Sequence, residues 1–319
     1  MVAEYGPPVA NPLAEQAVGA INDVSGTHHG HRAAHAKGIL MAGEFTPAPD
    51  AARLTRAAHM QGDPVRATVR LSNGGGNPDL PDYAREGRGL AVKLYLDDRS
   101  TTDMVAVSLP CFFVRTPEDF IEFTRSRKPD PETGQPDMEK IGAWLGAHPE
   151  AQVAIQAALA AGPPESYATV VYNGIHSFRW LDDDGEARFI RYRWEPEAGE
   201  RSLADDEARE RGRDYLQEDI VGRPGAAWRL TVAMAEDGDA IDDPTVAWPE
   251  ERERVEVGRL QLDGLEEGRE RGDDVLVFDP MRLTDGIEPS DDRILRFRPR
   301  AYAVSVERRS GAPVPAGLG

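Results

Sequence analysis

A tyrosine flanked by two arginines near the C-terminus is the grouping in this sequence best suited to chemistry. Arg298, Tyr302 and Arg309 are spaced i, i+4 and i+11, which places them on one face of a helix. A free phenol ionises near a pH of about 10, so a phenolate at neutral pH requires nearby cations or a metal ion. An arginine contact together with an iron(III) ion could supply that stabilisation. A helix with a buried tyrosine and solvated arginines would show the same spacing.

A second grouping lies near the N-terminus, where Arg32 precedes His35 by three residues in the run RAAHAKG. On a helical turn the two side chains would share a face, and a neighbouring cation keeps an imidazole neutral. A neutral histidine can accept a proton and return it, which suits a general base. Two other interpretations stay open. His28, His29 and His31 indicate a surface cluster, and the i, i+4 spacing of His31 and His35 is typical of zinc-binding helices.

A third grouping is the pair Arg70 and Ser72 in the run TVRLS. Strand alternation puts these two on one face and Val69 and Leu71 on the other. An arginine with a hydroxyl two residues later could neutralise a carboxylate and orient a histidine. A polar row facing solvent would have the same pattern.

The elements that must position these residues are mostly strands. Alternating apolar and polar residues predict strands over 65–72, 89–96, 167–181, 187–195, 228–235 and 254–262. Helical patterns cover 27–36, 116–125, 138–161, 204–217 and 289–309, a loop covers 73–82 and a tight turn covers 182–185. Many strands without regular βαβ alternation predict an α+β fold, an antiparallel β-barrel with helices packed outside it. We expect a Pro/Ala-rich N-terminal lead over 1–25, helical around 14–21, and a single domain over 26–319.

The composition excludes several classes of protein. A formal net charge of −19 and a pI near 4.8 repel nucleic acid and anionic membranes, so neither is an expected partner. The single cysteine, Cys111, cannot form an intrachain disulfide. The first residues lack the basic and apolar regions of a signal peptide, and no apolar run approaches the roughly 20 residues that span a bilayer. We expect a soluble, cytoplasmic protein, and the absence of a Gly-rich dinucleotide fingerprint assigns no nicotinamide cofactor.

Five segments resemble motifs of one known family, the haem catalases. RAAHAKG is similar to the R-x-x-H-A-K-G signature, and TVRLS to the V-R-F-S segment that follows it. The segment 107–115 resembles N-N-T-P-x-F-F-x-R, and GIHSF at 174–178 resembles G-S-H-T-F. GIEPS at 286–290, followed by R-x-x-x-Y, resembles the proximal motif. The motifs keep the family's order along the chain, and the sequence is identified as a member of the minimal, catalase-related peroxidase branch of the catalase-like family.

The resemblance implies a b-type haem (iron protoporphyrin IX) between the barrel and the C-terminal helix. Tyr302 would ligate the iron, and Arg298 would hold it as phenolate. His35 would be the distal base and Ser72 its hydrogen-bond partner. The remaining haem contacts implied by the motifs are Arg32, Ala34, Arg70, Phe112, Phe120, His176 and Arg309.

The sequence departs from the family pattern at the distal asparagine, where it has Val107. A valine cannot donate a hydrogen bond, and losing one preorganised donor typically lowers a rate by about 10²–10³. We therefore expect weak peroxide dismutation. The proximal motif also differs at three positions, where an aromatic residue, a proline and an aspartate are replaced by Arg300, Ala303 and Val304. These replacements alter the surroundings of Tyr302 and leave the ligand itself unchanged. Glu86 falls where the family has a channel acid, but Gly87 replaces the proline that follows.

The resemblance predicts a haem-dependent peroxidase that reduces hydrogen peroxide or organic hydroperoxides with a small organic electron donor, as a monomer or homodimer. Two alternatives remain: a lipid hydroperoxide isomerase on the same scaffold, and a haem-binding protein without catalysis. Retention of His35, Arg32 and Ser72 together favours catalysis, since a carrier needs no proton shuttle.

Overall fold

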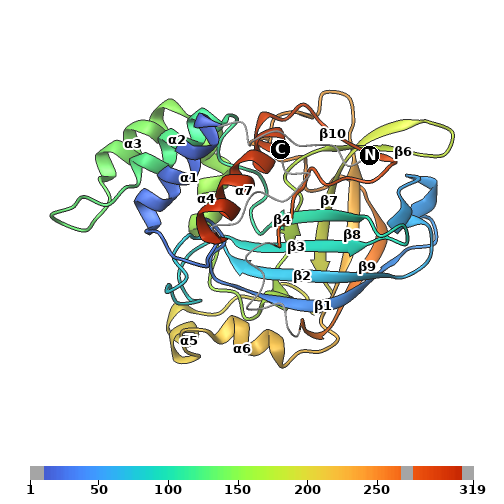
Figure 1. Cartoon of the computed structure of the whole chain (residues 1–319), viewed down its shortest axis with the longest axis horizontal. Coiled ribbons are helices and arrows are strands. Elements are labelled where there is room, and N and C mark those ends of the chain that lie inside the picture. The colour runs from blue at the N-terminus through green and yellow to red at the C-terminus, as the bar shows by residue number, and fades with distance from the viewer. Residues whose placement is uncertain (1–10, 267–275, 311–319) are drawn as a thin grey trace.

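A closed antiparallel β-barrel forms the centre of the protein (Figure 1). The computed structural model describes residues 11–266 and 276–310. The barrel strands are β1 (Gly38–Pro47), β2 (Val65–Asn73), β3 (Arg88–Tyr95), β4 (Thr101–Val107), β5 (Tyr172–Asn173), β7 (Ala187–Pro196), β8 (Ala227–Met234) and β9 (Arg254–Leu265). They follow the order β7-β5-β4-β3-β2-β1-β9-β8, and a pairing of β7 with β8 closes the ring. Two short strands, β6 (Phe178–Leu181) and β10 (Ile287–Pro289), extend the sheet beside β7. The predicted α+β barrel is confirmed.

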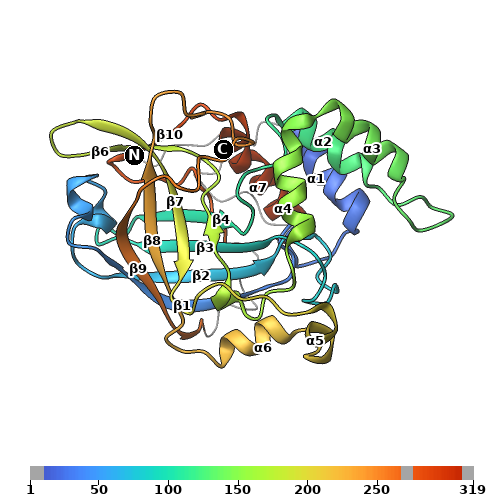
Figure 2. The ribbon, with the colours of Figure 1, turned by 180° about the vertical axis from the view of Figure 1, so that it is seen from behind.

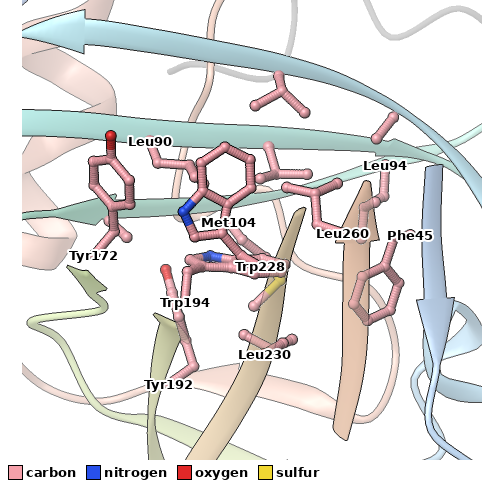
Figure 3. Packing of buried hydrophobic residues seen from close by; sticks show 14 of the residues in the cluster. Phe45, Leu90, Leu94, Met104, Tyr172, Tyr192, Trp194, Trp228, Leu230 and Leu260 are labelled. Atoms are coloured by element: carbon pink, nitrogen blue, oxygen red, sulfur yellow. The ribbon is translucent and has the colours of Figure 1, made fainter. Parts of the chain in front are cut away.

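Along the barrel strands, side chains alternate between the filled interior and the outer face of the barrel. On β2, Val69 and Leu71 point into the barrel core, whereas Arg70 and Ser72 belong to the opposite face. Figure 3 shows the interior packed with large side chains, among them the buried Trp194 and Trp228. Because side chains fill the barrel, its interior offers no room for a large cofactor, and the site must be sought outside the barrel wall.

Helices lie outside the barrel, as the sequence predicts. In Figures 1 and 2, α1 to α4 gather beside one end of the barrel, α5 and α6 lie along another side, and α7 runs between the first group and the strands. Their bounds are α1 (Pro12–Ser25), α2 (Pro117–Ser126), α3 (Met138–Ala147), α4 (Gln152–Ala160), α5 (Asp205–Glu210), α6 (Tyr215–Val221) and α7 (Arg293–Ser310). On α1, Ala17 and Ala20 pack against Ile121 of α2, so the N-terminal helix is held by apolar contacts.

Side-chain caps explain where α1 and α2 begin. The Asn11 side chain accepts a hydrogen bond from the Ala14 N–H at 3.1 Å, and Pro12 begins α1. The Thr116 hydroxyl accepts from the Asp119 N–H at 3.1 Å in the same way at the start of α2. Both caps satisfy backbone donors that a helix start leaves free.

Four local predictions are wrong. The expected helix over 204–217 divides into α5 (Asp205–Glu210) and α6 (Tyr215–Val221). Residues 27–36 form turns and bends rather than a helix, because the N–H groups of His35 and Ala36 donate to the carbonyls of Gly74 and Gly75 on another loop. The expected strand over 167–181 is a short 3-10 turn followed by the separate strands β5 and β6. The expected helix over 138–161 divides near Pro149, which begins a 3-10 turn between α3 and α4. No helix of the described residues is long and apolar enough to cross a membrane.

A buried histidine inside the barrel leads to a stability prediction. His59, in a 3-10 turn (Ala58–Met60), is 1% exposed, and neither ring nitrogen has a hydrogen-bond partner among the residues that the structure describes. Burial lowers its pKa from 6.5 to about 4. Because the folded pKa lies below the unfolded value, the neutral ring favours folding above pH 6.5, and that contribution is lost as the pH falls towards 4.

A His59→Leu variant is therefore expected to gain stability, because it removes polar atoms that burial leaves unsatisfied. The gain in the free energy of unfolding at pH 7 should be about 1 to 3 kcal/mol, and larger at pH 5. Urea unfolding at both pH values measures it. The exposed His29, replaced by leucine, is the control and should change neither value. An unchanged acid sensitivity in His59→Leu would contradict the prediction.

Candidate functional site

The outer face of β1 to β4, called the platform below, carries several small side chains. Two rows of paired residues cross it: Gly38, Ser72, Gly89 and Val107, and, two residues along each strand, Leu40, Arg70, Ala91 and Val105. Ala91, Val105 and Val107 are only partly buried. Their neighbours along the strands, such as Leu90 and Met104, are buried in the barrel core. The platform therefore presents apolar surface that the barrel itself does not cover.

The platform is faced from outside by α7 and by the segment that follows residue 275. Leu276 and Phe278 pack against the Leu40 side of the platform, with Ala91 and Val105 in the same cluster. Val277, between them, packs against Val306 of α7, with Tyr302 and Ala303 at the edge of that cluster. Strand face, segment and helix thus enclose one region.

A buried carboxylate fixes this segment to the barrel. Asp103 of β4 accepts hydrogen bonds from the Lys93 ammonium at 2.6 Å and from the Asp279 N–H at 2.8 Å. It also forms an ion pair with Arg282 at 2.6 Å. Lys93 and Asp103 are register partners on β3 and β4. The pairing of β3 with β4 therefore fixes the segment that begins at residue 276, which packs against α7 near Tyr302.

His35 lies on the platform side and is held by its neighbours. Its Nδ1 is 3.0 Å from the Ser72 hydroxyl, and its backbone adopts a left-handed conformation with φ 54°. The side chain keeps some accessible surface, yet protein surrounds it closely. This desolvation is the largest cause of a pKa lowered to about 3, and the charges of Arg70, Arg298 and Arg32 contribute to the same shift. The imidazole is therefore neutral at physiological pH.

The origin of this neutrality differs from the sequence interpretation. Burial has the largest effect, and Arg70 is the most effective cation, whereas Arg32 contributes least of the three arginines. Arg32 and His35 do not share a helical face, because residues 27–36 are not helical. His31 is exposed and its Nδ1 lies 3.4 Å from the Ala36 carbonyl. Among residues 11–266 and 276–310, the one group suited to a metal ion is Asp119, Glu122 and His148, so the His31–His35 zinc interpretation gains no support.

Gly89 makes the position of His35 possible. A Cβ on Gly89 would lie 2.7 Å from His35 Nδ1 and 2.8 Å from the Ser72 hydroxyl, closer than real Cβ contacts allow. The residue opposite the imidazole must therefore lack a side chain. Sequence reasoning did not single out Gly89; its place in register beside Ser72 is the signal that would have found it.

Replacing Gly89 by alanine is expected to displace the imidazole and to lower any reaction that uses His35 as a base by about 10²-fold, as misplacement by an ångström typically does. Steady-state kinetics on the folded variant measure the loss. Gly264, on β9, is the matched control because an added Cβ there meets nothing within 4 Å. Equal losses at both glycines, or none at Gly89, would show that the close approach to His35 has no role.

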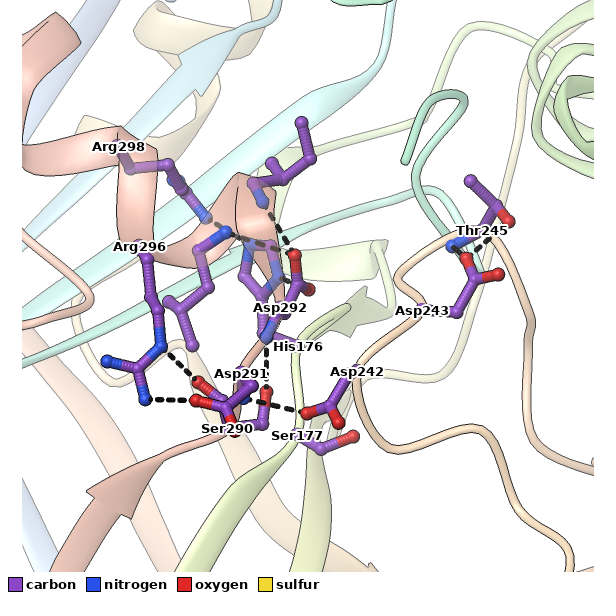
Figure 4. A network of polar contacts seen from close by, with 12 residues as sticks. His176, Ser177, Asp242, Asp243, Thr245, Ser290, Asp291, Asp292, Arg296 and Arg298 are labelled. Carbon is purple, nitrogen blue, oxygen red and sulfur yellow. Dashed lines mark hydrogen bonds and ion pairs between the residues drawn. The ribbon is translucent and has the colours of Figure 1, made fainter. Parts of the chain in front are cut away.

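Tyr302 ends a chain of polar contacts at the start of α7. Its hydroxyl accepts a hydrogen bond from Arg298 Nε at 2.7 Å, and Arg298 Nη1 lies 3.0 Å from His176 Nε2. His176 Nδ1 lies 2.6 Å from an oxygen of Asp292. Figure 4 shows Arg298, His176 and Asp292 joined in this network. The order of contacts is therefore Asp292, His176, Arg298, Tyr302.

The direction of each hydrogen bond in this chain follows from the arginine. A guanidinium only donates, so His176 Nε2 must accept and its proton must sit on Nδ1, from which it is donated to Asp292. Burial lowers the pKa of His176, outweighing the effect of Asp292, which keeps the ring neutral. Because Arg298 also donates to Tyr302, its positive charge lies against the phenol oxygen, with Nε at 2.7 Å.

Helix α7 explains why these groups meet. The second oxygen of Asp292 accepts from the N–H groups of Ile294 and Leu295 at 2.8 and 3.2 Å, so one carboxylate both caps the helix and binds His176. The helix starts at Arg293, and Pro299 lies inside it. Asp292 was not singled out from the sequence, although an aspartate just before a helical run is a typical cap signal.

The other arginines of the motifs gather at the edge of the same region. Arg32 and Arg309 both donate to the Leu276 carbonyl, at 2.7 and 3.2 Å. Arg70 lies against Gly38, where a Cβ would be 2.8 Å from its guanidinium carbon. Three guanidinium groups from separate parts of the chain thus border one apolar region, which is an arrangement suited to a planar ligand carrying carboxylates.

The aromatic residues of the motifs lie on the helical side. The rings of Phe112 and Phe120 are nearly parallel, with centroids 6.4 Å apart and planes at 7°. Both are partly buried against the cluster of Val114 and Phe123. Ala34 is partly buried beside His35. Glu86 is held by the Gly75 N–H at 3.2 Å, and burial raises its pKa.

Comparison with known proteins agrees with this arrangement. A sequence model described as Catalase matches residues 21–315. A catalase-related peroxidase from Mycolicibacterium paratuberculosis is 41% identical over 301 residues, covering 93% of this chain and 95% of the relative. A catalase-related peroxidase from Synechococcus elongatus is 32% identical over 312 residues, covering 97% and 92%. A bromoperoxidase-catalase from Streptomyces venezuelae is 30% identical over 297 residues, which are 88% of this chain and 61% of that protein.

Proposed function

The chain belongs to the catalase family, and from this membership we propose that it is a haem-dependent peroxidase that reduces hydrogen peroxide or organic hydroperoxides with an organic electron donor. The observation that carries the proposal is the pairing of a neutral imidazole with an arginine-bound phenol around one region. His35 is held by Ser72 on the strand face, and Tyr302 is held by Arg298 on α7. Arg298 is near enough to His35 to lower its pKa.

The residues present fit a b-type haem. A phenol whose oxygen accepts from an arginine is a suitable ligand for iron(III). Arg32, Arg70 and Arg309 would supply cations for two propionates, and Gly89, Ala91, Val105 and Val107 of the platform offer an apolar surface. When bound, the haem supplies an iron centre that accepts two oxidising equivalents from a hydroperoxide and passes them on to electron donors.

In this proposal His35 moves the proton. With Nδ1 engaged by Ser72, the second ring nitrogen is free to accept the proton of the hydroperoxide and to return it to the departing oxygen, which leaves as water or alcohol. A neutral imidazole is the form that this role requires, and it is the form that burial favours. Two donor molecules each give one electron and one proton per hydroperoxide consumed.

On the other side, Arg298 stabilises the anionic form of Tyr302, and the Asp292–His176 pair holds Arg298 in place. Arg32, Arg70 and Arg309 would bind the carboxylates of the cofactor, and Ala34, Phe112, Phe120 and His176 would border it. These assignments follow the motif resemblance.

We propose further that the peroxidase activity exceeds the catalase activity. Val107 shares a row with Ser72 and Gly89 on the platform, so the position near His35 where an amide would hold peroxide carries a methyl group instead. Loss of one such donor lowers a rate by about 10²–10³. No observation favours the isomerase or the carrier. A cytoplasmic monomer or homodimer without nucleic-acid or membrane partners is consistent with the net charge of −19.

The experiment that tests the function is direct. The full chain, loaded with haem, should show one b-type haem per chain by the pyridine spectrum and should oxidise a phenolic dye when hydrogen peroxide is added. Free haem at the same concentration is the control. A protein that binds haem but oxidises no donor above that control would be a carrier and would overturn the proposal.

A further inference from the structure

A continuous row of aromatic rings runs from Phe112 towards the surface of the helical group. The centroids of Phe112 and Phe113 are 4.4 Å apart, those of Phe113 and Phe123 are 5.0 Å apart, and those of Phe123 and Trp144 are 4.6 Å apart. The row starts at Phe112, which the proposed function assigns to the border of the haem, and passes through α2 to α3. It therefore joins that region to the outside by ring contacts alone.

Trp144 is the member of this row that chemistry distinguishes. Phenylalanine rings resist one-electron oxidation, whereas an indole gives up an electron readily. The Trp144 Nε1–H is buried and, within the described part of the chain, has no hydrogen-bond partner. An oxidised Trp144 therefore has no neighbouring group to take its proton and would keep its positive charge, which makes it a stronger oxidant towards a donor.

The row reaches the surface through a stacked histidine. The Trp144 and His148 rings are 4.0 Å apart with planes at 14°. Trp144 is 9% exposed and the His148 side chain is 19% exposed. An electron donor at this surface can thus approach the indole through one ring.

Acidic side chains surround this end of the row. Asp119, Glu122 and His148 offer ligand atoms within 4.8 Å of one another, and Glu150 accepts from His148 Nδ1 at 3.1 Å. Burial alone would raise the pKa of Glu150, but hydrogen bonds from its backbone and His148 outweigh it, so the net shift is downward and the carboxylate stays ionised. Negative charge beside a ring lowers the cost of placing a positive charge on it.

Resting on the proposed function, we propose that Trp144 is an electron-relay residue through which the enzyme oxidises bulky, electron-rich aromatic donors at the surface of α3. Trp144 passes one electron along the phenylalanine row to the oxidised cofactor and becomes a radical cation. The donor then returns one electron to Trp144 and releases its own proton to water. Two such rounds match the two oxidising equivalents of one hydroperoxide.

The test uses the haem-loaded full chain and two tryptophan variants. Trp144→Phe keeps a ring in the stack and removes the oxidisable group. Trp248→Phe is the matched control, because Trp248 is 7% exposed, similar to Trp144, and its Nε1–H donates to the Ala240 carbonyl. A third variant, Phe123→Leu, retains Trp144 and interrupts the row.

Three measurements test the relay: the radical signal, the site of oxidation and the ratio of two donor oxidation rates. Peroxide is added without a donor, radicals are trapped by freezing for electron paramagnetic resonance, and oxidised residues are mapped by mass spectrometry. Oxidation in the wild type should occur at Trp144 about tenfold more than at Trp248. In Trp144→Phe, the ratio of the oxidation rate of a bulky dye to that of a small phenol should fall about tenfold, with a smaller fall in Phe123→Leu and none in Trp248→Phe.

The outcomes separate the two proposals. A wild type that oxidises donors, together with a Trp144→Phe variant of unchanged rate ratio and unchanged radical signal, would overturn the relay and leave the peroxidase intact. Oxidation at Trp248 in preference to Trp144 would overturn it as well. A wild type that binds haem but oxidises neither donor would contradict the peroxidase function and the relay together.

Discussion

A His35→Ala variant is expected to fold and bind haem as the wild type does, and to oxidise donors with hydrogen peroxide about 10²–10⁴-fold more slowly, the usual contribution of a positioned general base. The reason lies in its surroundings. Ser72 holds Nδ1 at 3.0 Å, and Gly89 leaves room for the ring. Removing the imidazole removes the group that would move the hydroperoxide proton. Stopped-flow absorbance after mixing with peroxide measures the step directly.

The control for this variant is His31→Ala. His31 lies four residues before His35 but is exposed. Its loss should therefore change the rate by no more than about twofold. A similar loss in both variants would point to a general disturbance of the loop, and a full rate in His35→Ala would remove the proposed base.

The pH dependence of the rate is a second test of the role of His35. Burial, reinforced by Arg70, Arg298 and Arg32, lowers the pKa of His35 to about 3. The base form therefore persists as the pH falls from 8 to about 5, and protonation of His35 should not reduce the rate in this range. A rate that falls with an apparent pKa near 6.5, the ordinary value for histidine, would show that the ring is not desolvated.

A Tyr302→Phe variant is expected to lose the peroxidase activity by about 10³-fold and to change the absorption spectrum of the bound haem. Phenylalanine keeps the ring that meets the Val277 and Val306 cluster, so packing is preserved. What is lost is the oxygen that accepts from Arg298 at 2.7 Å and would bind the iron. Optical spectra of the loaded variant and wild type, recorded with steady-state rates, test both effects.

Tyr83, partly buried and outside this region, provides the matched control as Tyr83→Phe and should change neither spectrum nor rate. Arg298→Lys adds a graded test, because lysine keeps the charge but loses the planar contact with both Tyr302 and His176. A spectrum that is the same in Tyr302→Phe and wild type would exclude Tyr302 as the ligand.

The parts of the site that the sequence could predict are those set by local periodicity. Arg298 and Tyr302 meet because four residues make about one turn of helix α7, and that holds wherever the helix packs. Arg70 and Ser72 share the outer face of β2 for the same kind of reason, since alternation fixes the face. Spacing alone therefore sufficed for these two pairs.

The parts that the sequence could not predict depend on distant partners. His176 and Asp292 are 116 residues apart in the chain, and only the packing of α7 against the loop before β6 joins them. Likewise, the segment before β1 is not helical, because the backbone donors of His35 and Ala36 find partners on the loop after β2. No local pattern records such contacts.

Prediction of the barrel strands is limited in the same way, by pairing between distant parts of the chain. The strands β2 and β3 alternate and are predictable, whereas β1 and β4 are missing from the sequence prediction. Gly38, Gly43 and Pro47 interrupt the pattern of β1, and β4 is short. Their pairing with β2, β3 and β9 fixes them as strands, and closure of the ring by β7 and β8 is a property of the whole chain.

The most direct measurement is a crystal structure of the full chain loaded with haem. The account predicts that the Tyr302 oxygen binds the iron while still accepting a hydrogen bond from Arg298 Nε, and that His35 stands over the opposite face of the porphyrin with Ser72 still at its Nδ1. Iron ligated by His35, His176 or any residue other than Tyr302, or a porphyrin with both side chains on one face, would contradict it.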